Sequence, residues 1–181
     1  VGTFLEKLLR EKKVLREGVR VAILGPPNAG KSTLMNAIVG SKVAITSDRP
    51  QTTRRTIRGI VTRSDGQLII VDTPGMHRPR TLLGERLNDQ VHETLAGVDV
   101  IGLCLPATDD VGPGDRYIAQ QVAASKAVGF AVVTKTDAVS ADRVAEQLMR
   151  AQQLGNEVGI DTDEFRAGFA IEDVGEGDFL A

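Results

Sequence analysis

The chain has 181 residues, of which 41% are hydrophobic, enough for one compact domain with a sizeable core but not for two full domains. Its net charge of −2 excludes a global positive field for nucleic acid or anionic lipid, so such a partner would need a local patch. No apolar run approaches the ~18 residues of a membrane span, and the single Cys104 excludes an intramolecular disulfide. We therefore expect a cytoplasmic monomer without a membrane span, in which Cys104 is a buried small hydrophobe.

Short apolar runs alternate with longer stretches of helical spacing along most of the chain. Residues 1–18 are set apart, because apolar residues recur there at helical spacing and predict an amphipathic helix over 3–16 that ends at Gly18. Residues 19–181 are expected to form one domain. The predicted strands are 19–24, 56–62, 67–71, 98–105 and 127–133, and the predicted helices are 31–39, 83–96, 114–124 and 141–154.

This alternation predicts an α/β fold, with a doubly wound and mostly parallel sheet and helices on both faces. The turn Ser64-Asp65-Gly66 is too short for a crossover, so the strands on either side of it should form an antiparallel pair at one edge. From residue 155 onward the chain is acidic and weakly periodic, and no element is predicted there.

The first motif follows the first predicted strand and precedes a predicted helix, which is the context that a phosphate-binding loop requires. It fits the pattern GxxxxGK[ST], in which glycines turn backbone N–H groups toward a phosphate at a helix N-terminus. Lys31 would reach the β and γ phosphates, and the Ser32 hydroxyl would be a ligand of Mg²⁺. The residues expected to bind nucleotide here are Gly25, Pro26, Pro27, Asn28, Ala29, Gly30, Lys31, Ser32 and Thr33.

The second motif, Asp72-Thr73-Pro74-Gly75, stands at the end of the strand predicted over 67–71. A carboxylate at a strand end can hold a metal-bound water, and a glycine amide can meet a γ-phosphate oxygen with no side chain in the way. Taken alone, the four residues are an ordinary turn. Their position 41 residues after Lys31 favours a sensor of metal and γ-phosphate.

The third motif, Thr134-Lys135-Thr136-Asp137, follows the strand predicted over 127–133. A carboxylate there can accept hydrogen bonds from N1–H and from the exocyclic amine of guanine, a pattern that adenine cannot offer. The aliphatic stem of Lys135 can lie along the base. The motif therefore favours guanine over adenine nucleotides.

The three motifs in this order, with the stretches 27–33, 42–47, 49–54, 72–80 and 82–84, resemble the Era-like GTPases of the TrmE-Era-EngA-YihA-Septin-like class. The resemblance implies a P-loop NTPase fold, GTP hydrolysis with Mg²⁺, and a nucleotide-dependent switch in assembly of the small ribosomal subunit. It also implies that Thr53, or else Thr52, reaches Mg²⁺ when the γ-phosphate is present, within switches at 47–55 and 75–84. The family's RNA-binding KH domain has no counterpart in this sequence, so RNA binding by that route is not supported.

Five residues either depart from the family pattern or bear on the mechanism. Thr134 replaces the usual asparagine, and its hydroxyl can still tie this loop to the phosphate loop with fewer bonds. Ala170-Ile171 is the nearest alignment to the loop that closes over the base. Met76 stands where Ras-type enzymes orient water with glutamine, so slow hydrolysis is expected to rest on Lys31, Mg²⁺ and loop amides. Asn28 resembles the potassium-coordinating asparagine of MnmE-like GTPases, and the alternative is a residue that only stabilises the loop.

Two further questions stay open from sequence. Residues 8–20 resemble the approach to the GTPase domain in the MnmE family, so one alternative is a chimeric or engineered scaffold that binds guanine nucleotide with little turnover. Another is a subunit that signals to RNA-processing machinery. The single basic stretch either contacts RNA or an acidic partner, or is a solvated strand and loop that balances the acidic C-terminal residues. It comprises Arg49, Arg54, Arg55, Arg58 and Arg63.

Overall fold

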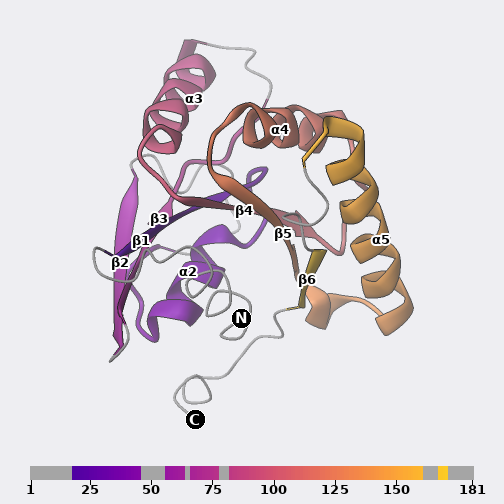
Figure 1. The fold of residues 1–181 in the computed structure, drawn as a ribbon. Helices are drawn as coiled ribbons and strands as arrows, with labels where there is room; N and C mark the ends of the chain where they lie inside the picture. Colours follow the sequence, from indigo (N-terminus) through magenta and orange to yellow (C-terminus); the bar gives the residue numbers. More distant parts are fainter. Residues whose placement is uncertain (1–17, 46–55, 64–65, 78–81, 161–166, 171–181) are drawn as a thin grey trace.

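The computed structural model describes residues 18–45, 56–63, 66–77, 82–160 and 167–170. Within these ranges the backbone forms a six-stranded sheet in the order β2-β3-β1-β4-β5-β6 (Figure 1). Its strands are β1 (Val19–Leu24), β2 (Ile57–Arg63), β3 (Gly66–Asp72), β4 (Val100–Pro106), β5 (Val128–Thr134) and β6 (Ala167–Ala170). All pairs are parallel except β2–β3, so the predicted doubly wound sheet with one antiparallel edge strand is confirmed.

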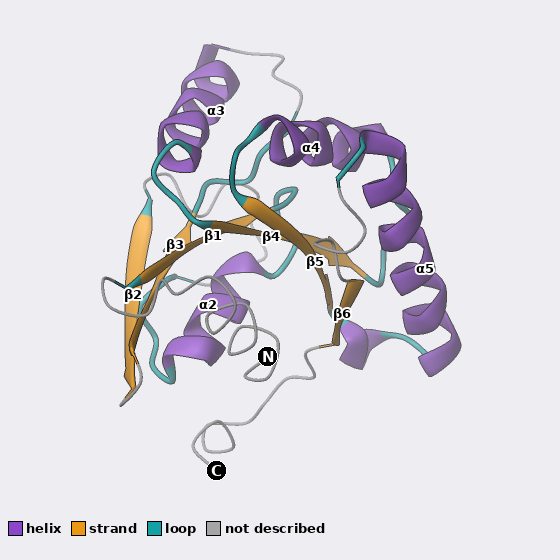
Figure 2. Cartoon of the chain, viewed as in Figure 1, coloured by secondary structure: helices purple, strands orange, loops and turns teal. Residues whose placement is uncertain are grey.

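Helices cover both faces of this sheet, as predicted (Figure 2). They are α2 (Lys31–Val39), α3 (Leu82–Leu95), α4 (Pro113–Ala124) and α5 (Ala141–Val158), with a short 3₁₀ turn, η1 (Thr136–Ala138). Strand side chains alternate between the faces: Ala22 and Leu24 pack with α3, α4 and α5, whereas Val21 and Ile23 pack with α2. No helix in the described ranges has both the length and the apolarity needed to cross a membrane.

Two predictions near the C-terminus were wrong. Helix α5 does not end at residue 154 but continues to Val158, because Gly155 is buried inside the helix and the left-handed cap is Gly159, with φ 75°. Strand β6 was missed because its Ala-Gly-Phe-Ala sequence has little intrinsic preference for a strand, and its pairing with β5 decides its structure. The helix predicted over 3–16 lies outside the described residues.

Candidate nucleotide-binding site

The three motif loops meet at one edge of the sheet, beyond the carboxyl ends of β1, β3 and β5. Ile23 near the end of β1 is paired with Asp72 at the end of β3, and β5 ends at Thr134 beside Pro106 of β4. In doubly wound folds this edge is where ligands bind, since the loops that follow parallel strands gather there. The sheet order therefore brings together motifs that are separated by more than 100 residues in the chain.

The loop between β1 and α2 has the backbone that the glycine pattern predicted. Gly30 caps α2 in the left-handed region with φ 80°, and without a side chain it leaves the first-turn N–H groups accessible to a ligand. Asn28 also has positive φ, at 60°, a conformation that asparagine tolerates better than most residues. Its neighbour Ala29 is fully buried, whereas the Asn28 side chain is exposed. The loop is thus anchored in the core and open on its outer side.

Lys31 lies folded into this loop and is only 7% exposed. Its Nζ donates hydrogen bonds to the backbone oxygens of Pro26 at 2.7 Å and Gly25 at 3.2 Å. Burial lowers the pKa of Lys31, and the nearby Cys104 and Asp72 act in the opposite direction. A phosphate bound in the loop would supply the negative charge that favours the ammonium form.

The two described residues that were expected to hold Mg²⁺ are in contact. The Ser32 hydroxyl donates a 2.7 Å hydrogen bond to Oδ2 of Asp72, which is completely buried at the end of β3. A hydroxyl and a carboxylate are hard oxygen ligands of the kind that Mg²⁺ prefers when phosphates complete its coordination. The donor set therefore fits this ion. Thr52 and Thr53, the candidates for the third protein ligand, lie outside the described residues.

Gly75 lies directly against the phosphate loop. A Cβ atom at Gly75 would come within 2.9 Å of both Cα and N of Pro27, so only glycine fits this approach. The preceding Thr73 donates through Oγ1 to the Ile23 carbonyl at 2.7 Å, and the Met76 amide donates to the Gly25 carbonyl at 3.1 Å. These bonds hold the second motif beside the first.

The Met76 side chain points away from this edge, into the hydrophobic core. It is completely buried and belongs to the cluster that includes Leu24, Val91 and Leu95. The sequence identified Met76 as chemically unable to orient water, and the structure adds that its side chain packs among core residues.

The third motif is tied to the first by the bond predicted for Thr134. Its Oγ1 donates to the Ala29 carbonyl at 2.7 Å, so the expected bond between the two loops is present. Lys135 follows with a positive φ of 57°, and Asp137 lies exposed in η1. Ala170 pairs with Val133 at the neighbouring strand end, whereas residue 171 lies outside the described ranges.

Sequence reasoning missed three polar residues that support these loops. Asn88 of α3 is 4% exposed and donates to the His77 carbonyl at 2.9 Å. Arg143 and Gln147 of α5 bind backbone carbonyls at the end of β4. The signal for the last two was polar residues four positions apart, which share one face of a helix.

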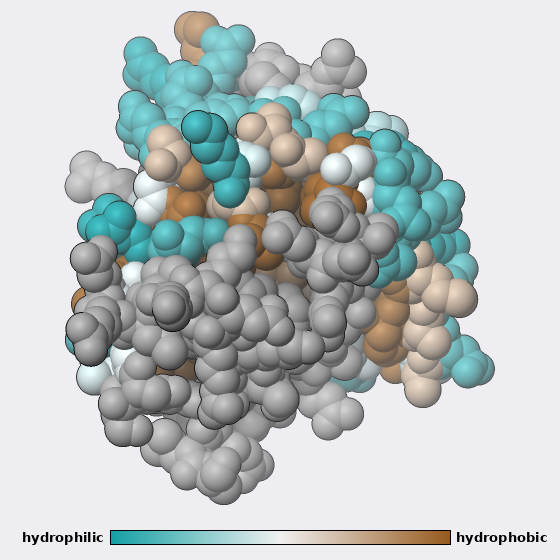
Figure 3. Space-filling view, viewed as in Figure 1, coloured by the Kyte–Doolittle hydropathy of each residue, from teal (hydrophilic) through white to brown (hydrophobic). Residues whose placement is uncertain are grey.

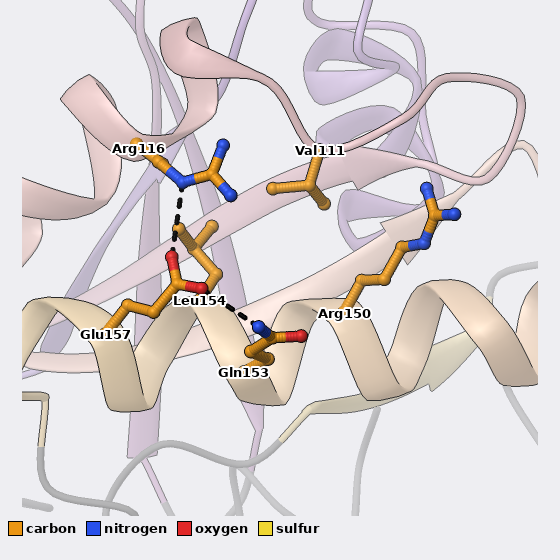
Figure 4. Close-up of a pocket in the computed structure, with 6 residues that line it drawn as sticks. All are labelled: Val111, Arg116, Arg150, Gln153, Leu154 and Glu157. Carbon is orange, nitrogen blue, oxygen red and sulfur yellow. Dashed lines mark hydrogen bonds and ion pairs between the residues drawn. The ribbon is translucent and has the colours of Figure 1, made fainter.

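A groove between α4 and α5 lies outside the three motifs (Figure 4). Its two arginines already have acidic partners: Arg116 pairs with Glu157, and Arg150 with Glu146 and Asp110. The groove is lined by Val111, Arg116, Arg150, Gln153, Leu154 and Glu157.

Comparison with known proteins identifies one family. The profile described as 50S ribosome-binding GTPase matches residues 20–135. GTPase Era of Streptomyces coelicolor is 65% identical over 138 residues, which cover 76% of this chain and 44% of that protein. GTPase Era of a Nocardioides species is 61% identical over 145 residues, which cover 80% of this chain and 46% of that protein. The chain thus spans less than half the length of these two relatives.

Two solved structures align with most of this chain. An Era crystal structure in complex with MgGDPNP and nucleotides 1506–1542 of 16S ribosomal RNA aligns with a TM-score of 0.74 at 30% identity, over 86% of this chain and 51% of that one. Toc33 from Arabidopsis thaliana in complex with GDP and Mg²⁺ aligns with a TM-score of 0.66 at 17% identity, over 95% of this chain and 77% of that one. The second likeness supports the fold alone.

Proposed function

The chain belongs to the family of 50S ribosome-binding GTPases, and on that basis we propose that it binds GTP and GDP and hydrolyses GTP with Mg²⁺. The observation that carries the proposal is the joining of the three motifs by two hydrogen bonds of 2.7 Å, Ser32 to Asp72 and Thr134 to Ala29. Because these bonds bring the three loops together, they support a single site for phosphate, metal ion and base. The identity of 61–65% to GTPase Era proteins supports the same function.

Each motif has a defined task in this proposal. The loop amides from Gly25 to Thr33 surround the α and β phosphates, and Lys31 neutralises charge on the β and γ phosphates. Ser32, Asp72 and Thr53 would hold Mg²⁺, which when bound would supply further positive charge to the phosphates. The Gly75 amide donates to a γ-phosphate oxygen. Because Met76 is buried, the attacking water is oriented by backbone groups and not by this side chain.

Guanine is read by Asp137, which accepts hydrogen bonds from N1–H and the exocyclic amine, while the Lys135 stem covers the base. The exposed position of Asp137 in η1 leaves its carboxylate accessible to a ligand. Thr134 holds the start of this loop on Ala29, so the base-reading and phosphate-binding loops share one anchor.

A K⁺ ion beside Asn28 is a further part of the proposal. The Asn28 side chain is exposed at the outer side of the phosphate loop, where a monovalent cation could add positive charge near the transferred phosphoryl group. GTP turnover measured in KCl and in NaCl at equal ionic strength tests this point. A faster rate in KCl that Asn28→Ala removes supports the assignment, and equal rates refute it.

As a switch, the domain would act in the cytoplasm on assembly of the small ribosomal subunit. The support is the family profile, the identity to GTPase Era proteins and the Era structure in complex with 16S ribosomal RNA. Co-sedimentation with purified small subunits, in the presence of GDPNP or of GDP, tests this role. Binding that depends on the nucleotide supports it, and equal or absent binding in both states counts against it.

The decisive experiment for the proposed activity is a GTP titration with and without Mg²⁺, with ATP as competitor, followed by single-turnover phosphate release. We expect GTP binding that requires Mg²⁺ for full affinity and that excess ATP does not displace. Binding without phosphate release would support a scaffold that binds nucleotide without turnover. The variant Asp137→Asn should shift preference from GDP toward XDP, because the amide NH₂ meets the xanthine carbonyl in place of the guanine amine.

A further inference from the structure

The loop that carries Asp137 is fastened at its start to the residue that follows β4 and at its end to helix α5. At its start, the Ala107 amide donates a 2.8 Å hydrogen bond to the Thr134 carbonyl, which continues the pairing of β4 with β5. At its end, Ser140 caps α5 by accepting a hydrogen bond from the Arg143 amide. The first turns of α5 therefore determine where the loop ends.

Two side chains of α5 dock its first turns on the same segment. The Nε2 of Gln147, which is 1% exposed, donates to the Pro106 carbonyl at 2.9 Å. Arg143, one turn earlier, donates from Nε to the Ala107 carbonyl at 3.0 Å and from NH2 to the Asp109 carbonyl at 3.1 Å. The planar guanidinium, with its fork of donors, is suited to bridging two carbonyls at once.

The backbone between these anchors is held in a conformation that it would not adopt freely. Lys135 has φ 57°, and a non-glycine residue in the left-handed region costs about 1–2 kcal/mol. Such strain persists only where the surrounding structure fixes it, and it concentrates at ligand-binding sites. The bond that the Ala107 amide donates to Thr134 fixes one end of the five-residue loop 135–139, and the bonds from Arg143 and Gln147 fix the other. Asp137 lies within this loop.

We propose that Arg143 and Gln147 are positioning residues for guanine recognition. They hold the Asp137 carboxylate where it can accept a hydrogen bond from the exocyclic amine of the base. The inference rests on the proposed function, since it takes Asp137 as the group that reads guanine. Neither side chain belongs to the three motifs, and each acts through the backbone of residues 106–109.

Arg150 provides a matched control on the same helix. Both arginines pair with Asp110 and Glu146, so their charge environment is shared. Among the described residues, however, Arg150 donates no hydrogen bond to a backbone carbonyl, whereas Arg143 donates to two. It lines the groove between α4 and α5 (Figure 4). Arg143→Met and Arg150→Met thus remove similar ion pairs, and only the first removes the bonds to residues 107 and 109.

The experiment compares calorimetric affinities for GDP and for inosine diphosphate, which retains N1–H but lacks the exocyclic amine. In the unmodified protein we expect GDP to bind roughly tenfold or more tightly than inosine diphosphate, as for a hydrogen bond to a charged group. Arg143→Met should reduce this ratio at least about threefold, and Gln147→Met should reduce it in the same direction. Arg150→Met should leave the ratio within about twofold of the unmodified protein.

The ratio separates positioning from general loss of stability, because a loosened fold weakens both ligands together and leaves the ratio unchanged. An unchanged ratio in a folded Arg143→Met protein, or an equal reduction in Arg150→Met, overturns the inference. If Gln147→Met does not fold, Arg143→Met decides the question alone, since that side chain is partly exposed. If the unmodified protein shows no preference for GDP over ADP, the proposed function fails instead.

Discussion

The Thr134 hydroxyl and the Ala29 carbonyl form a 2.7 Å hydrogen bond across 105 residues of the chain. Both residues are buried, Thr134 at 5% exposed and Ala29 at 0%. The bond directly connects the loop that is proposed to read the base with the loop that is proposed to bind phosphate. In the proposed site a single hydroxyl makes this connection, whereas the usual asparagine can form several bonds from one amide.

Thr134→Val removes this hydroxyl while keeping the shape of the side chain. The Ala29 carbonyl then remains buried without this donor, which costs about 1–3 kcal/mol, and GDP affinity should fall roughly tenfold. Isothermal calorimetry measures the change. Thr62→Val is the control, because its hydroxyl bonds only with the exposed Gln67 side chain among the described residues. Equal GDP affinities for Thr134→Val and the unmodified protein would contradict the role of this bond.

Gly75→Ala tests the close approach of the second motif to the phosphate loop. The added Cβ would lie 2.9 Å from Pro27 Cα and N, so the two segments must separate. Because the Gly75 amide is proposed to serve the γ-phosphate, affinity for GDPNP should fall about tenfold while that for GDP changes little. Gly114→Ala is the control, since nothing lies within 4 Å of its added Cβ. Equal losses for both nucleotides would refute a specific γ-phosphate role.

Much of this fold could be predicted from the sequence because its signals are local. Apolar runs bounded by turn residues gave five strands to within about two residues, and the short turn at 64–66 identified the antiparallel pair. The phosphate loop was also predictable, because its backbone requires glycine at a fixed position. Gly30 has φ 80°, in the left-handed region that glycine adopts most easily.

The rest depends on contacts that no local pattern encodes. Strand β6 exists through its pairing with β5, and α5 passes through Gly155 because that residue is buried against neighbouring elements. The positions of Arg143 and Gln147 relative to Pro106 and Ala107 follow from how α5 packs on the sheet. A motif search finds residues of the loops themselves. Residues such as Arg143 and Gln147, which bond to the backbone near a loop from a neighbouring helix, are identified only from the three-dimensional structure.

Met76→Gln places a glutamine directly after Gly75, where Ras-type enzymes have the glutamine that orients water. The variant tests whether this side chain can take that role here. The Met76 side chain is fully buried with Leu24 and Val91, so glutamine there would bury an amide and cost about 1–3 kcal/mol of unfolding free energy. We expect a lower melting temperature and no faster GTP hydrolysis. Met149→Gln is the control, because Met149 is 68% exposed and should tolerate the same change. A gain in turnover at unchanged stability would show that residue 76 can reach the phosphates.

The Cys104 thiol should resist thiol reagents in the folded protein although the positive charge of Lys31 acts on it. Burial raises the pKa of Cys104 to about 12, and the Lys31 charge lowers it only in part. The thiolate is the reactive form, so a pKa raised from 9.0 to about 12 reduces the thiolate fraction at pH 8 by roughly a thousandfold. Burial at 0% exposure adds a steric block.

Labelling with Ellman's reagent between pH 7 and 9 checks this, with protein unfolded in guanidinium chloride as the control. The unfolded chain should release one equivalent of the coloured thiolate of the reagent. The rate of this release should rise with pH, because the fraction of Cys104 present as thiolate increases as the pH approaches the ordinary pKa of a thiol. The folded chain should label slowly at every pH in this range, because burial both keeps the thiol protonated and excludes the reagent, so that reaction requires opening of the structure. Rapid stoichiometric labelling of the folded protein at pH 7 would contradict the burial of Cys104.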